Sequence, residues 1–106
     1  MKQMQIIPKD GFNLYGALVK REVELRKANQ GTFRRVGGRT KDAATWKHKS
    51  LAGRVKLRRG LGGIVAGGIR SRADAEDEWK IFRAFLGFID RTLGENVAAI
   101  NIQFVE

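Results

Sequence analysis

The segment that most constrains the fold is the stretch from Asp74 to Leu93. Its apolar residues recur with the 3.6-residue period of an α-helix and form one stripe about 120° wide. The stripe comprises Ala75, Trp79, Phe82, Phe85, Leu86, Ile89 and Leu93. Ser71 or Asp74 can cap its start, the first turns are acidic, and Gly94 can end it. The pattern predicts an amphipathic helix that packs its stripe against a core.

A second helical period runs from Phe12 to Asn29. Three leucines share one line of the helical wheel: Leu14, Leu18 and Leu25. Asn29-Gln30-Gly31 follows as a helix end. Glu22 falls on the apolar side of this helix, so we expect it to pair with Arg26 or with an arginine of the sheet.

Six further segments have the alternation or composition of strands, with 32–36 the weakest: 3–7, 32–36, 45–50, 54–58, 63–69 and 98–105. Gly67-Gly68 is expected to mark a bulge or a strand end. Two amphipathic helices can cover only one face of such a sheet. We therefore predict a two-layer α+β sandwich with a mainly antiparallel sheet of four to five strands and a split βαβ-like arrangement.

Length and composition restrict the classes of protein that remain. The 106 residues, with neither repeat nor linker, predict one domain spanning 1–106. No cysteine and a single histidine exclude disulfides, thiol chemistry and the usual zinc sites, and the glycines match no phosphate-loop or dinucleotide pattern. We therefore expect no metal and no cofactor. The chain has no apolar run long enough for a membrane span, so we expect a cytoplasmic protein without membrane contact.

Charge is concentrated in the glycine-rich β region 31–72. This region holds twelve Lys/Arg and one acid, Asp42, so it carries a net +11, while the rest of the chain sums to −1. Arg54-Val55-Lys56-Leu57-Arg58 alternates, which places its cations on the face opposite Val55 and Leu57. Twelve cations against one acid exceed what solubility requires, and this favours a polyanionic partner.

The leading hypothesis is a non-enzymatic domain that grips the phosphates of DNA or RNA with its central strands. We count Trp46 among the expected contacts because an exposed tryptophan beside lysines can stack on a base, although a tryptophan on a strand is more often part of the core. The expected contacts are Arg34, Arg35, Arg39, Trp46, Lys47, Lys49, Arg54, Lys56, Arg58 and Arg59.

Two other classes of function remain open. His48 between Lys47 and Lys49 suits a small metal-independent endoribonuclease, in which a histidine moves protons and cations hold the phosphate. A basic sheet also suits an interaction module that docks an acidic protein. Separately, a second apolar stripe of the C-terminal helix, Ile81, Ala84 and Phe88, points away from the first and suggests a homodimer.

Overall fold

The computed structural model describes residues 1–71 and 74–105, so Arg72, counted above among the cations, lies outside the described residues. The strands are β1 (Lys2–Pro8), β2 (Phe33–Arg35), β3 (Ala43–His48), β4 (Arg54–Arg59), β5 (Val65–Arg70) and β6 (Val97–Phe104). The helices are α1 (Leu14–Lys27) and α2 (Ala75–Leu93), and single 3₁₀ turns precede β5 and β6. Asn13 caps α1 by accepting from the Gly16 N–H, and Asp74 caps α2 by accepting from the Asp77 N–H.

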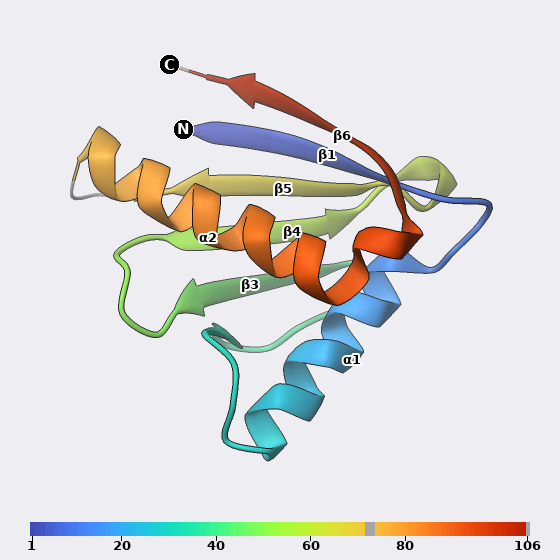
Figure 1. Cartoon of the computed structure of the whole chain (residues 1–106), viewed down its shortest axis with the longest axis horizontal. Helices are drawn as coiled ribbons and strands as arrows, with labels where there is room; N and C mark the ends of the chain where they lie inside the picture. Colours follow the sequence, from blue (N-terminus) through green and yellow to red (C-terminus); the bar gives the residue numbers. More distant parts are fainter. Residues whose placement is uncertain (72–73, 106) are drawn as a thin grey trace.

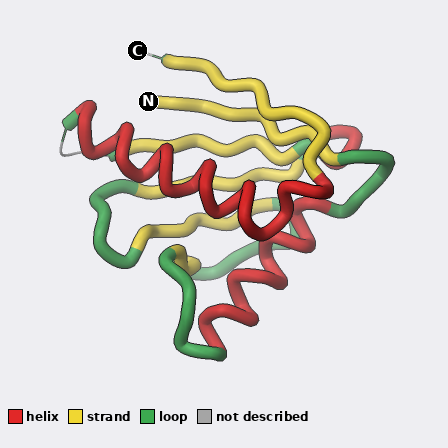
Figure 2. Tube along the Cα trace, viewed as in Figure 1, coloured by secondary structure: helices red, strands yellow, loops and turns green. Residues whose placement is uncertain are grey.

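All six strands form one sheet in the order β2-β3-β4-β5-β1-β6, and every neighbouring pair is antiparallel. Helix α2 connects β5 to β6, and β1 lies between these two parallel strands, so this part is a split βαβ unit. Both helices lie on the near side of the sheet in Figures 1 and 2, and no described helix covers the far side. The predicted α+β class is confirmed, and the sheet is one strand larger than expected.

Alternate residues of each strand point toward the helices and form the core. In β1, β4 and β5 these are Met4, Ile6, Val55, Leu57, Val65 and Ile69, all buried. Gly67 and Gly68 are both paired within β5, so the expected bulge or strand end there is wrong. A Cβ on Gly67 would lie 3.1 Å from the Met4 Cγ, so glycine at this position makes room for the methionine.

Aromatic rings fill the core where α2 crosses β2 and β3. The Trp46 ring lies edge-on to Phe88, with centroids 5.6 Å apart, and to Phe85 at 6.2 Å. Phe33 of β2 closes the cluster at 5.7 Å from Phe88. Trp46 is only 1% exposed, so it is a core residue and is not available to stack on a base.

The buried face of α2 is rotated from the predicted stripe. Ile81 and Phe88 are buried within the chain, so the expectation that this second stripe is free for a homodimer is wrong. Trp79, predicted to face the core, is 39% exposed. The reason is that α2 packs against the aromatic residues of β2 and β3, and their position is not visible in the period of the helix itself.

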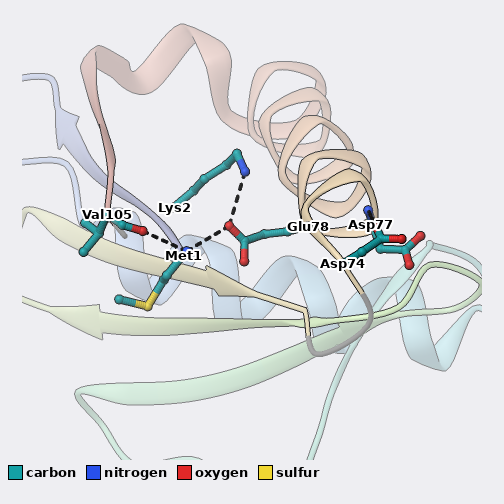
Figure 3. Close-up of polar contacts among 6 residues, drawn as sticks. All are labelled: Met1, Lys2, Asp74, Asp77, Glu78 and Val105. Atoms are coloured by element: carbon teal, nitrogen blue, oxygen red, sulfur yellow. Dashed lines mark hydrogen bonds and ion pairs between the residues drawn. The ribbon is translucent and has the colours of Figure 1, made fainter.

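The N-terminus ties β1, β6 and α2 together (Figure 3). The Met1 ammonium donates to the Val105 carbonyl oxygen at 2.9 Å and lies 3.1 Å from Glu78 Oε1, which also accepts from Lys2 Nζ at 3.2 Å. Burial alone would raise the pKa of Glu78, but the hydrogen bonds from the ammonium and from Lys2 outweigh it and hold the pKa below its ordinary value.

Candidate nucleic-acid interface

The open face of the sheet, which no described helix covers, carries a row of cations. In the strand register Arg34 of β2 lies opposite Lys47 of β3, Lys47 opposite Arg54 of β4, and Arg54 opposite Arg70 of β5. These four residues, which we call the cation row, occupy adjacent strands about 4.8 Å apart. The row therefore extends about 14 Å across the sheet.

A second line of cations runs along β4 and crosses the row at Arg54. Arg54, Lys56 and Arg58 are exposed and alternate with the buried Val55 and Leu57, as the sequence predicted. Successive members are about 6.7 Å apart along the strand. We call these three residues the cation ridge. Small residues on both neighbouring strands flank Lys56 and Arg58, whereas Arg54 lies between Lys47 and Arg70.

On one side of the ridge lies a hollow of about 210 Å³ over β5, which we call the β5 groove. Its floor is made of Ala66 and Gly68, and no atom lies within 4 Å of where a Gly68 Cβ would be. Lys56 and Arg58 form one wall, and side-chain amides from β1 and β6 form the other: Gln3, Gln5, Asn101 and Gln103. The groove is therefore cationic on one side and a neutral hydrogen-bonding surface on the other.

No acidic residue among those described offsets these charges on the sheet. None of the six strands contains an aspartate or a glutamate. Among the described residues, the ion pairs involve carboxylates of α1 and α2 only, and none reaches the cation row or the ridge. Asp42, the one acid of the basic region, lies near Tyr15 of α1, where burial first and then the charge of Asp42 raise the pKa of the Tyr15 phenol. The open face of β2 to β5 thus carries cations and no described carboxylate.

Five of the ten expected contact residues belong to this face: Arg34, Lys47, Arg54, Lys56 and Arg58. The Arg34 guanidinium also donates to Asn29 Oδ1 at 3.4 Å. Lys49 is exposed just beyond β3, where its backbone N–H donates to the Thr32 oxygen.

The remaining expected contacts lie elsewhere. Arg59 is on the helix side of β4, where it lies over the Tyr15 ring at 5.2 Å and donates to Asn13 Oδ1 at 3.0 Å. Arg39 is in the loop between β2 and β3, and Arg35 is paired opposite the buried Trp46 on the helix side. The sheet therefore separates Arg35 and Arg59 from the ridge.

His48 has a structural role at the turn after β3. Its Nδ1 accepts hydrogen bonds from the backbone N–H groups of Ser50 and Leu51, both at 3.0 Å, and its ring lies edge-on to Phe33. Burial, and then the neighbouring charge of Lys49, lower the pKa of the imidazole below 6.5. The ring lies on the helix side of β3, whereas Lys47 lies on the open face, so the two do not form a common site.

Glu22 is 2% exposed and pairs with Arg26, whose Nε lies 3.2 Å from Oε2. The expected ion pair is therefore confirmed, and its partner is a residue of the same helix. This carboxylate belongs to the packing of α1 and lies outside the open face.

Arg70 and the four amides were not predicted as site residues from the sequence. The alternation of β5 was visible, with Val65 and Ile69 facing inward, and it places Arg70 on the outer face. The information missing from the sequence was the strand order, since only the pairing of β1 with both β5 and β6 brings the amides beside Lys56 and Arg58.

Two further classes of site were searched within residues 1–71 and 74–105. No group of three His, Asp or Glu side chains there is arranged to hold a metal ion. Neither described helix has the length and hydropathy needed to cross a membrane.

The fold and the charged face define a small α+β domain with an exposed basic sheet. No protein-family model matches the chain, and neither the curated proteins nor the solved structures contain a match to it.

Proposed function

We propose that this domain binds nucleic acid through backbone phosphates on the open face of its sheet. The observation that carries the proposal is the cation row, in which four like charges lie directly opposite one another on adjacent strands. Like charges opposite each other destabilise a sheet. A polyanion lying across the row would relieve that repulsion, and a nucleic-acid backbone is such a ligand.

The β5 groove suggests how one strand of the ligand would lie. Its walls stand on β4 and β1, which are two strand spacings or about 10 Å apart, wide enough for a single strand but not for a duplex. Phosphates would contact Lys56 and Arg58, while Gln3 and Gln103 on the other wall would meet sugars or base edges.

This arrangement predicts weak base preference. None of the strand residues on the open face is aromatic, and Trp46 is buried. Stacking on aromatic rings supplies much of the affinity of many single-strand binders, so here phosphate contacts must dominate. The endoribonuclease alternative receives no support from the position of His48, whose Nδ1 is already engaged by the backbone.

The test measures, by fluorescence anisotropy, the binding of single- and double-stranded RNA and DNA over a range of salt concentrations. The double variant Arg54→Gln/Lys56→Gln should weaken binding. It should also reduce the slope of log affinity against log salt by about 1.4 on single strands, since each phosphate contact contributes about 0.7. Base preference should not change.

The matched control is Lys20→Gln/Arg21→Gln, which removes two exposed cations from α1 in the other layer. It lowers the net charge equally and should leave the slope unchanged. Equal effects of the two variants would indicate attraction by net charge alone. Absence of binding to every nucleic acid at low salt would sink the proposal, and an acidic protein surface would become the leading partner.

A further inference from the structure

Strand β6 is an exposed edge of the sheet without the usual protection. Val105 and Met1 exchange both backbone hydrogen bonds, at 2.8 and 2.9 Å. Because such pairs alternate in an antiparallel ladder, Phe104, Ile102 and Ile100 direct their N–H and C=O groups away from β1, toward the open edge. Between Val97 and Val105 there is no charge and no proline, the residues that commonly block edge pairing.

Apolar side chains accompany these backbone groups. On the helix side of the edge, Phe104 is 68% exposed and Ile102 39% exposed. Trp79 of α2, also partly exposed, lies beside Phe104 with ring centroids 6.4 Å apart. We call these three residues the β6 patch. Such a patch beside an unpaired strand is typical of a surface that another strand covers.

We infer that β6 pairs with β6 of a second copy of this chain, in antiparallel orientation about a two-fold axis perpendicular to the sheet. If Ile102 lies on the axis, Ile102 pairs with its own copy and Phe104 pairs with Ile100 of the second copy. All of these residues direct their backbone groups outward, so the ladder continues. Their side chains all remain on the helix side, where the two patches meet.

The distribution of charge and the self-complementary edge favour a second copy as the partner. Each molecule carries +10, so two copies repel unless they approach where cations are fewest. The cation row and ridge lie on β2 to β5, whereas the open face of β1 and β6 presents the neutral amides. Near the β6 patch, Lys2 and the Met1 ammonium are paired with Glu78, and the Arg83 guanidinium lies over the Trp79 ring at 5.7 Å. Of the six described strands, β6 is thus the only one without a charged residue, and its outward-facing edge is self-complementary.

Two variants test the interface while sparing the fold. Ile102→Pro removes an N–H that points away from β1 to the open edge, a position where strands tolerate proline. Phe104→Lys places a charge on the patch. Leu61→Lys is the matched control, since Leu61 is 93% exposed in the turn between β4 and β5. Circular dichroism confirms that each variant is folded.

The readout is mass from sedimentation equilibrium across the micromolar to millimolar range, together with amide hydrogen exchange. As concentration rises, the mass of wild type and of Leu61→Lys should increase from that of one chain to that of two. Amide hydrogen exchange should slow at Ile100, Ile102 and Phe104. Ile102→Pro and Phe104→Lys should remain single chains. The inference is overturned if wild type stays a single chain at millimolar concentration, which would leave the edge to a strand of another protein. It is equally overturned if both edge variants still dimerise.

Discussion

At the scale of single residues, side-chain direction decides which cations can act together. Alternation in β4 correctly placed Arg54, Lys56 and Arg58 on the face opposite Val55 and Leu57. It did not place Arg59, because the strand continues one residue further than predicted and this side chain lies on the helix side. The face on which a cation lies is therefore predicted better by its alternating position within the strand than by its nearness in the sequence to other cations.

His48 illustrates the same point and leads to a prediction. The folded state lowers the pKa of the imidazole below 6.5, so folded molecules bind fewer protons than unfolded ones in that range. Stability from this group is present in full above pH 6.5 and is lost as the pH falls from there through the lowered pKa of the folded state. Protonation would also displace the two N–H donors from Nδ1.

We expect His48→Asn to reduce this pH dependence. The Asn side-chain oxygen can replace Nδ1 as the acceptor for Ser50 and Leu51 but does not titrate. Urea unfolding between about pH 7 and pH 5 should show wild type losing more stability than the variant as the pH falls. Parallel curves for the two proteins would show that His48 does not couple to folding.

At the scale of elements, hydrophobic period predicted both helices and the existence of the strands, but not which side of α2 is most deeply buried. The hydrophobic period shows which arc of the helix is apolar, and the strands packed against the helix determine which residues of that arc are most deeply buried. Phe88 is buried because Trp46 and Phe33 come from strands distant in the sequence. Trp79 is displaced toward β6, where coverage by the sheet ends.

In strand β5, Gly67 and Gly68 face opposite sides of the sheet, so we expect substitutions at the two positions to have different effects. Gly67→Leu should destabilise the fold by about 1–3 kcal/mol, since its side chain would overpack Met4. Gly68→Leu should fold normally, because open space surrounds that position, yet it should weaken nucleic-acid binding by filling the β5 groove. Thermal unfolding and anisotropy measure the two effects separately. If Gly68→Leu binds as wild type does, the ligand does not enter the groove.

At the scale of the whole molecule, the class of fold could be predicted from the order of helical and strand periods, but the strand order could not. Alternation shows which face of a strand is buried and says nothing of its neighbours. The pairing of β1 with β5 and β6 creates the amide wall of the β5 groove and leaves β6 at the edge. Both features belong to topology, and this is why residues 3, 5, 101 and 103 were not recognised as part of a site.

The position of β1 also governs how the chain can reach this structure. Its two partners, β5 and β6, come from the far part of the sequence, whereas β3, β4 and β5 are successive strands joined by short turns. Closing a long loop costs conformational entropy before the contacts that it allows have formed, so we expect the β3-β4-β5 meander to form first and β1 to dock late.

Val55→Ala should then slow refolding, whereas Ile6→Val should mainly speed unfolding. Stopped-flow measurements on both variants distinguish these outcomes, and a refolding rate lowered chiefly by Ile6→Val would reverse the order. Until β1 docks, the apolar residues of α2 have no complete sheet to cover them, so the chain is most exposed to aggregation in the interval before β1 docks.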